Sequence, residues 1–523
     1  MQIKKISFPV LILLMLFAVS CTKKDEMKEV FYYAMNGDIP NLDPIFATDM
    51  NSLNVVYDIF EGLTAYNPKN LAVIEAVASS WEISNDKRKY TFHIRKEAKW
   101  SNGDELTAED FKKSWLRAID PKLKVPYAYY LHYIKNAREY NQGLITNPNL
   151  VGIKTEGKLK LIVELAKPTT FFLELTAFPV FFPVPMDLIK KHKNKWTLAH
   201  NIISNGAFKL SKTLPVPGFF AEKNKHYYNA KEVYLKGVKY FALQNGKKAY
   251  KDFMDNKYHK LTIVPQIFHE EASKLKEFRA APISSTMFLL FNTKSKALSQ
   301  VSVRRALMLA IDKELIVKNV LKSNQMVAHS FVPPIFKDYT SPANETYSPK
   351  RAKYLFKRAG FSQGKNFPKI IINYTTLEMK KDVLNIIVKG WKEILGIDVT
   401  IQNMTRKEFF QKLGSLDYDV AMSEWFGDYL DPLAFLELFI SNSGNNNTGW
   451  ASSIFDSLIL TANNQMSDKL RINLLQQAEE LLLKDAPIIP LFHGTKDYLL
   501  KSNIKGVYDN PIFYQPCKYI TIE

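Results

Sequence analysis

Cysteine is scarce in this sequence, which has only Cys21 and Cys517 among 523 residues. No Cys-x-x-Cys pair and no Gly-rich phosphate loop occur, so the patterns of a zinc ribbon and of a P-loop ATPase are absent. The segment His269-Glu270-Glu271 lacks the second histidine that would complete a zinc-binding helix. We therefore predict no metal site and no cofactor.

The N-terminal apolar run, Ile6–Val19, is too short for a comfortable membrane span. Two lysines precede it and small residues follow, which is the order of a secretory signal. Its ending, Ala18-Val19-Ser20-Cys21, resembles a bacterial lipobox, in which the cysteine carries lipid and becomes the first mature residue. A short uncleaved anchor is the alternative, but it gives no reason for a cysteine at this point. We predict a signal peptide over 1–21 and lipidation of Cys21.

Acidic residues are fewer than basic ones. The 71 Lys and Arg and the 52 Asp and Glu give a formal net charge of +19. Such a balance could attract anionic lipids, murein or nucleic acid. The predicted secretory signal argues against nucleic acid as a ligand, and the basic residues are spread along the chain instead of forming an arm. A solvated basic surface is the default interpretation. If Cys21 carries lipid, the body can form no internal disulfide.

The body is long enough for several structural units, since single cores stop growing well before 523 residues. The charged segment Thr22–Glu29 indicates a flexible tether. Alternating apolar residues predict a hairpin from Trp81–Ser84 and Tyr90–Arg95. From about residue 350 to 440 strands alternate with helices, ending with a strand over Tyr418–Met422, which predicts an α/β sheet.

Residues Gly360-Phe361-Ser362-Gln363-Gly364 match G-x-S-x-G, the nucleophile elbow of α/β-hydrolases. That elbow must follow a strand and enter a helix. Here the motif follows a predicted helix that opens at Ser348-Pro349 and stops at Gly360. We interpret it as a turn that ends the helix, so nothing in the sequence demands an enzyme.

Six stretches of the sequence share their residues and their order with one family. They are Asn41–Pro44 with Phe60–Leu63, Thr91–Trp115, Ser204–Leu210, Val303–Ile316, Trp391–Ile401 and Trp425–Pro432. Together they resemble the extracytoplasmic oligopeptide-binding proteins of ABC importers, the OppA/DppA type of solute-binding family 5. The similarity covers nearly the whole mature chain.

This resemblance implies an α/β, two-lobed periplasmic-binding-protein fold of type II, in the large class with an extra domain, whose lobes are joined by a hinge. Ligand is engulfed as the lobes close. The implied division is 1–21 for the signal peptide, 22–50, 190–278 and 490–523 for lobe I, 51–189 for the extra domain II, and 279–489 for lobe III.

The resemblance also assigns Asp428, which stands among Trp425, Phe426 and Tyr429 just past the predicted strand. From local sequence alone, an Asp beside a Gly is more often a turn residue. In peptide-binding relatives the acid of W-x-x-D-Y pairs with the free α-amine of the peptide, and here that acid falls on Asp428. A charge-assisted contact would explain a carboxylate kept among aromatics.

Further ligand contacts follow from the same alignment. The backbone of Glu424, Trp425 and Phe426 corresponds to the segment that pairs with the ligand main chain, with the turn near Ile39 on the other side. Aromatic residues Tyr127 and Tyr130 are expected near the ligand, although core packing is the commoner role of such clusters. We also keep His493 as a candidate contact, although a lone histidine is usually a surface or satisfied core residue.

The sequence departs from the family where tripeptide-binding members place arginines for the peptide carboxylate. Met422 and Leu413 stand at those two positions. Arg406 takes the place of a pocket tryptophan, and Lys412 adjoins Leu413. Either cation could receive a carboxylate, although solvated helix faces carry such residues routinely.

We therefore predict a non-enzymatic, monomeric lipoprotein of the periplasm or cell envelope. It would capture oligopeptides and deliver them to ABC transporter permease subunits in the cytoplasmic membrane, without binding nucleic acid. The alternative within the family is a receptor for murein peptides, and nickel, haem or sugar are further family ligands.

Overall fold

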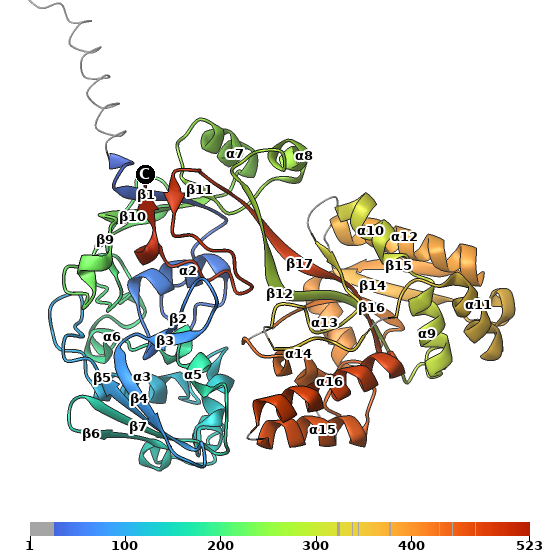
Figure 1. The fold of residues 1–523 in the computed structure, drawn as a ribbon, viewed down its shortest axis with the longest axis horizontal. Helices are drawn as coiled ribbons and strands as arrows, with labels where there is room; N and C mark the ends of the chain where they lie inside the picture. The colour runs from blue at the N-terminus through green and yellow to red at the C-terminus, as the bar shows by residue number, and fades with distance from the viewer. Residues whose placement is uncertain are drawn as a thin grey trace, which may run out of the picture. The chain divides into compact units, whose positions relative to one another are not determined.

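The structure is a computed structural model that describes residues 26–523, apart from 322–324, 337, 344, 376–377, 428, 442 and 466. Two predicted site residues, Cys21 and Asp428, lie outside the described residues. The chain forms two compact units: unit 1 ends at Ala280 and resumes over Lys496–Glu523, and unit 2 is Ala281–Thr495 (Figure 1). The chain passes between the units inside strands β12 (Phe278–Phe291) and β17 (Ile488–Leu500).

The central strand of unit 1 is β1 (Val30–Asn36), which pairs in parallel with β10 (Gly237–Leu243) and β11 (Lys260–Leu261). Its residues Val30–Met35 are all buried, as expected for a strand covered on both faces. Antiparallel strands β9 (Gly218–Lys223) and β8 (Phe208–Thr213) extend the sheet beyond β10.

A second sheet of unit 1 is antiparallel, with the order β4-β5-β7-β6. It contains the predicted hairpin as β4 (Ala78–Ile83) and β5 (Lys89–Ile94), in which Trp81 pairs with Phe92. Strands β7 (Lys160–Glu164) and β6 (Ile153–Glu156) complete it. The apolar positions of β5 are buried and alternate with partly exposed ones, so the predicted period-two pattern is confirmed.

Helices pack around these sheets. The helices of unit 1 longer than five residues are α2 (Met50–Ile59), α3 (Ala108–Ala118), α6 (Met186–His192) and α7 (Gly246–Met254). Helix α3 begins after Thr107, whose backbone N–H donates to the Asp110 carboxylate over 2.8 Å. The helix therefore starts with a capping box and with acids in its first turn.

Unit 2 has the strand order β15-β14-β16-β12-β17. Strands β15 (Val399–Met404), β14 (Ile370–Thr375) and β16 (Val420–Phe426) run parallel, and β12 is antiparallel to β16. The helices between them are α12 (Glu378–Leu395) and α13 (Arg406–Gly414), with α11 (Pro349–Arg358) before β14. The predicted alternation over 350–440 is confirmed.

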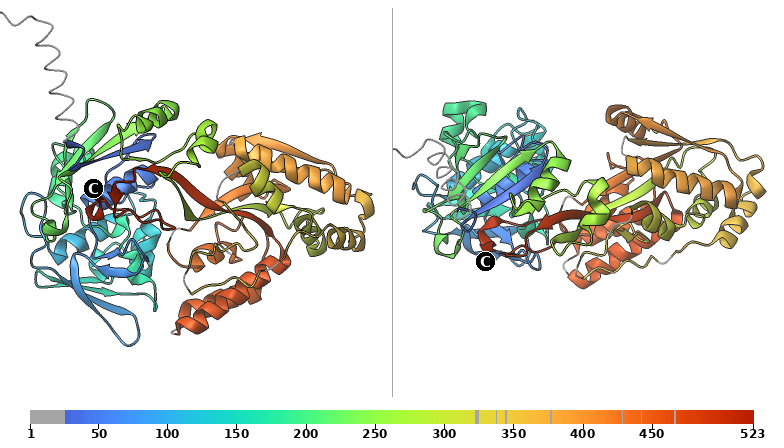
Figure 2. Two further views of the ribbon diagram at one scale, coloured as in Figure 1. Left: turned by 45° about the horizontal axis from the view of Figure 1, so that its top comes forward. Right: turned by 90° about the horizontal axis from the view of Figure 1, so that it is seen from above.

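The core of unit 2 lies between this sheet and its helices (Figures 1 and 2). Helix α9 (Val301–Leu309) contributes Val303, Ala306 and Leu307, which have no exposed surface and form its buried apolar stripe. The Trp391 indole N–H of α12 donates to the Leu307 carbonyl over 2.9 Å. Helices α15 (Ser453–Asn464) and α16 (Asp468–Asp485) lie side by side.

The G-x-S-x-G segment follows α11 and contains a single 3-10 turn, Ser362–Gly364. The first and last glycines of the segment, Gly360 and Gly364, have φ of +97° and +75°. The interpretation as a turn that ends the helix is confirmed, because no strand of the described chain leads into it. Among the described residues no helix combines the length and apolarity that crossing a membrane requires. The division of unit 1 into lobe I and domain II stays a prediction.

Candidate ligand-binding site

Three parallel strands of unit 2 end at one edge of its sheet, β14 at Thr375, β15 at Met404 and β16 at Phe426. Ligands of open α/β sheets bind outside the carboxyl ends of such strands, because the loops and helix starts gather there. Of the predicted ligand residues, Glu424, Trp425, Phe426 and Arg406 lie at this edge. We call it the binding edge.

Strand β16 has a half-paired backbone at the binding edge. On one side its whole length pairs with β12, up to Phe426 opposite Ser285. On the other side, β14 pairs with it only from Val420 to Met422. In the described part of the chain no strand pairs with residues 423–426 on that side. The N–H and C=O groups that point to that side, on alternate residues, are therefore available to an added strand.

Glu424 is the acidic residue of this segment. It is partly buried, and the Ser285 hydroxyl donates to its carboxylate over 2.9 Å. Burial raises the pKa of Glu424, while the hydrogen bond from Ser285 and the charge of Lys380 oppose that rise. A carboxylate held in this way favours a cation or donor nearby.

Lys380, in the first turn of α12, is the cation that faces Glu424 and was not predicted from the sequence. It is 9% exposed, and its ammonium donates to the Thr375 hydroxyl over 2.8 Å. Burial lowers its pKa, Glu424 acts in the opposite direction, and Arg406 lowers it further. A buried cation beside a second cation can accept an anionic group of a ligand.

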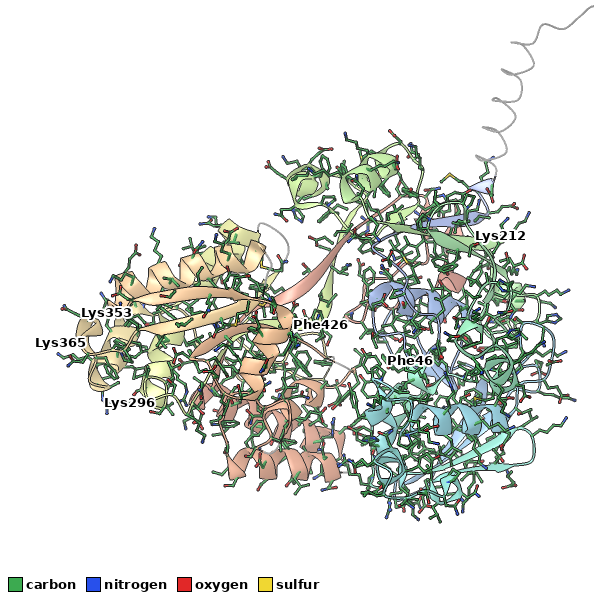
Figure 3. All side chains as sticks on the ribbon, turned by 180° about the vertical axis from the view of Figure 1, so that it is seen from behind. Phe46, Lys212, Lys296, Lys353, Lys365 and Phe426 are labelled. Atoms are coloured by element: carbon green, nitrogen blue, oxygen red, sulfur yellow. The ribbon has the colours of Figure 1, made fainter. Side chains whose placement is uncertain are left out.

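The aromatic residues of the segment have different environments. The Trp425 indole N–H donates to the Ala434 carbonyl over 2.8 Å, which fixes the ring. Phe426 is 54% exposed at the end of β16 (Figure 3). Tyr429 is buried, and its hydroxyl donates to Glu437 over 2.9 Å. Phe426 therefore offers an apolar surface, whereas Trp425 and Tyr429 support the loop.

The loop after β16 is held by a buried ion pair. Arg471 of α16 donates to both carboxylate oxygens of Asp431, over 2.7 and 2.8 Å. Asp431 also accepts from the Leu433 N–H over 2.9 Å. The Gly427 N–H donates to the Ser284 carbonyl over 2.8 Å. The bidentate Arg471–Asp431 pair fixes the loop after residue 428, and the Gly427 hydrogen bond fixes it before that residue.

The two predicted carboxylate partners lie at opposite ends of α13. Arg406 is exposed at its first residue, and its guanidinium lies 5.6 Å from the centre of the Phe410 ring. Lys412 lies in the last turn and forms an ion pair with Asp417 over 2.6 Å. Only Arg406 lies at the binding edge, and the charge of Lys412 is already matched.

His493 lies in the interior of unit 2, where it is 2% exposed. Its Nδ1 is 2.9 Å from the Thr286 hydroxyl oxygen. Burial, with Lys313 and His329 nearby, lowers its pKa to about 3, so the ring is neutral at physiological pH. This environment is that of a satisfied core histidine.

Three predicted contacts belong to unit 1. Ile39 is half-buried in the turn after β1. Tyr130 is buried, and its ring stacks at 5.5 Å on Tyr127, which is partly buried. Phe178 packs edge-on against both rings. Tyr130 is thus part of an aromatic core, and Tyr127 lies at its border.

Sequence reasoning missed Lys380 and Ser284. The hydroxyl of Ser284 is buried and has no hydrogen-bond partner among the described residues. One signal could have indicated Lys380: a lysine in the first turn of a helix opposes the helix dipole, so another interaction must compensate it. The serine carries no comparable signal.

Comparisons with known proteins agree with this geometry. Residues 72–447 match the family described as bacterial extracellular solute-binding proteins, family 5 middle. The oligopeptide-binding protein OppA of Bacillus subtilis (strain 168) is 34% identical over 481 residues, covering 89% of this chain and 88% of its own. The chain belongs to family 5 of the bacterial extracellular solute-binding proteins.

Two solved structures are similar over most of their length. The unliganded open form of MppA, a periplasmic murein tripeptide-binding protein, has a TM-score of 0.84 and 28% identity, covering 94% of this chain and 98% of its own. OppA of Listeria monocytogenes bound to peptide has a TM-score of 0.74 and 29% identity, covering 95% and 99%. The predicted OppA/DppA-type family and the two-lobed α/β fold of type II are confirmed.

Proposed function

We propose that this protein captures oligopeptides outside the cytoplasmic membrane and delivers them to the permease of an ABC importer. The observation that carries the proposal is the half-paired end of β16, residues 423–426, in a chain of this family. An extended peptide would add a strand there, through main-chain groups that every peptide has. Binding in this way is largely independent of peptide sequence.

The peptide termini would be bound by charged side chains. Asp428 would accept the free α-amine, and the firmly held loop around it supports this assignment. Lys380 would take the peptide carboxylate, together with the exposed Arg406. The burial of Lys380 supports its role, because a partly desolvated ammonium gains more from an added anion than a solvated one does.

The anchor, the monomeric state and the non-enzymatic role are further parts of the proposal, which the sequence supports. The protein is a monomeric lipoprotein held to a bacterial membrane through Cys21, and it is not an enzyme. Its relatives by name are binding proteins. Energy for transport comes from the partner ATPase, since this chain has no phosphate loop.

Thermal unfolding of the full chain in detergent tests the proposal. We expect alanine peptides of two to six residues to stabilise it by about 2.7 kcal/mol at a hundredfold excess over their dissociation constant. N-acetylated peptides and the variant Asp428→Asn should lose this stabilisation. No stabilisation by any free peptide, in protein stripped of bound ligand, would overturn the proposal.

A matched pair of lysine variants locates the carboxylate contact. Lys380→Met should weaken peptide binding by about tenfold or more, as expected for a lost charge-assisted hydrogen bond. The exposed neighbour Lys381 serves as the control, and Lys381→Met should bind like the parent. Equal effects of the two substitutions would contradict a role for Lys380.

Murein peptides are the second candidate ligand, favoured by the similarity to the murein tripeptide-binding protein. They carry extra carboxylates, which the neighbouring Lys380 and Arg406 would attract. A murein tripeptide in the same unfolding assay decides between the two: stronger stabilisation by it than by trialanine would assign the murein class.

A further inference from the structure

A small cavity of unit 2, apart from the binding edge, is lined by two charged side chains that each have unused hydrogen-bonding capacity. It has a volume of about 140 Å³ and lies between the end of α9, the short helix α10 (Lys313–Ile316), β13 (Met326–Val327) and the loop before α11. Its charged lining residues include Lys313 and Glu345, and its apolar ones include Ile311 and Val327. It shares no residue with the binding edge.

Lys313 is the cation of this cavity. It is only 7% exposed, and its ammonium donates to the Ala328 carbonyl over 2.8 Å. An ammonium has three N–H donors, so two of them have no acceptor in the described part of the chain. Burial lowers the pKa of Lys313 to about 7, and Glu345 acts against that decrease. An acceptor in the cavity would complete its hydrogen bonds.

Glu345 is the anion of the same cavity. One of its carboxylate oxygens accepts from Arg305 over 2.6 Å and from Arg351 over 3.1 Å. The other oxygen is buried and has no hydrogen-bond partner among the described residues. Leaving such a buried acceptor unsatisfied has a free-energy cost. A donor in the cavity would remove that cost.

We propose that this cavity binds a small zwitterion, a free α-amino acid with a short side chain. The carboxylate of the amino acid accepts from Lys313, and its ammonium group donates to Glu345. The methyl group of an alanine would lie against Ile311 and Val327. The cavity volume of about 140 Å³ is well above what a single water needs, which leaves room for glycine or alanine.

A simple ion fits the cavity less well than a zwitterion. An anion alone would accept from Lys313 but would leave the second carboxylate oxygen of Glu345 without a donor, whereas a cation alone would leave the free N–H groups of Lys313 without an acceptor. The other titratable groups here are Glu314, Tyr347, His329, whose Nδ1 is 3.3 Å from the Glu345 carbonyl oxygen, the two arginines on Glu345, and His493 nearby. Because an amino acid carries both charges, it adds none to this group.

Calorimetric titration of the full chain in detergent with L-alanine tests the inference. We expect one bound alanine per chain, both in the free protein and in protein saturated with trialanine, because the cavity is separate from the binding edge. Propanoate and alanine amide each lack one charge and should bind about tenfold or more weakly. Competition between alanine and trialanine would place the amino acid in the peptide site and overturn the inference.

The decisive variant is Lys313→Met, which keeps the length of the side chain and removes the buried ammonium together with its hydrogen bond to the Ala328 carbonyl. It should lower the affinity for alanine about tenfold or more, whereas Lys318→Met, at an exposed position five residues on, should not. Unchanged binding in Lys313→Met, or no binding of alanine to the parent, would overturn the inference. The result does not depend on whether peptides bind.

Discussion

At the scale of single residues, the chemical type of a side chain did not determine its role. His493 and Lys380 illustrate this. The histidine was a candidate contact, and it lies in the interior beside Thr286. The lysine was not among the predicted contacts, and it faces Glu424 at the binding edge. Sequence alone could not separate them, because burial and partners come from β12, β14 and β17, which are far apart in the chain.

The buried imidazole of His493 should make the protein acid-sensitive. Its pKa is about 3 in the folded protein against 6.5 for the free side chain, so the unfolded chain binds a proton first as pH falls. Stability is therefore lost below pH 6.5, and between pH 7.5 and pH 5 the loss from this residue is about 2 kcal/mol. Chemical denaturation at both pH values should show a smaller loss for His493→Gln.

The control for this prediction is His93→Gln, since His93 lies on the partly exposed face of β5 and contacts Glu82. The stability of the His93→Gln protein should depend on pH as the stability of the parent does. Parallel curves for the parent and His493→Gln would show that the interior imidazole does not cause the acid sensitivity.

At the scale of elements, hydrophobic period and capping residues predicted most of the fold. The strand β5 and the helix α11 were predicted because each signal lies within a few neighbouring residues. The end of β16 was predicted too early, at Met422, although the strand continues to Phe426. Ser423 and Glu424 are polar, and only the pairing with β12 keeps them in the strand.

Tight packing at the end of β16 should make Gly427 intolerant of a side chain. An added Cβ would lie 2.5 Å from the Ser284 hydroxyl and 2.6 Å from the Phe435 ring. We expect Gly427→Ala to destabilise the protein by about 1–3 kcal/mol, as overpacking does, and to weaken peptide binding because the strand end moves. Denaturant unfolding and a peptide titration measure the two effects.

Gly414, in the last turn of α13, is the matched control, because no described atom beyond its chain neighbours and its own helix backbone lies within 4 Å of an added Cβ. Gly414→Ala should be neutral or stabilise by up to about 1 kcal/mol, through lower backbone entropy in the unfolded chain. A Gly427→Ala protein as stable as Gly414→Ala would mean that β12 and β16 adjust to the added methyl group.

At the scale of the whole molecule, length correctly predicted more than one unit, but local signals could not mark where the chain crosses between them. The crossings at Ala280 and Thr495 fall inside β12 and β17, which are 14 and 13 residues long. A search for boundaries relies on turn residues and on shifts in composition, and a continuous strand has neither. The pairing of strands distant in sequence decides this level of organisation.

The two cysteines allow the predicted lipid anchor to be tested on the intact protein. Cys517 is fully buried, burial raises the pKa of its thiol, and its backbone N–H donates to Asp58 over 2.6 Å. It should not react with a thiol reagent in the native state, because the thiolate is the nucleophile and no path to it is open. In guanidinium chloride it should react at once.

Protein taken from the membrane fraction of a bacterial host should therefore show no reactive thiol when folded and one when unfolded, since a lipid thioether blocks Cys21. The variant Cys517→Ser should show none in either state. Two thiols in the unfolded parent, and one in Cys517→Ser, would mean that Cys21 carries no lipid. Rapid labelling of the folded Cys21→Ser variant would contradict the burial of Cys517. Because each count is a whole number, the anchor and the buried thiol are tested separately.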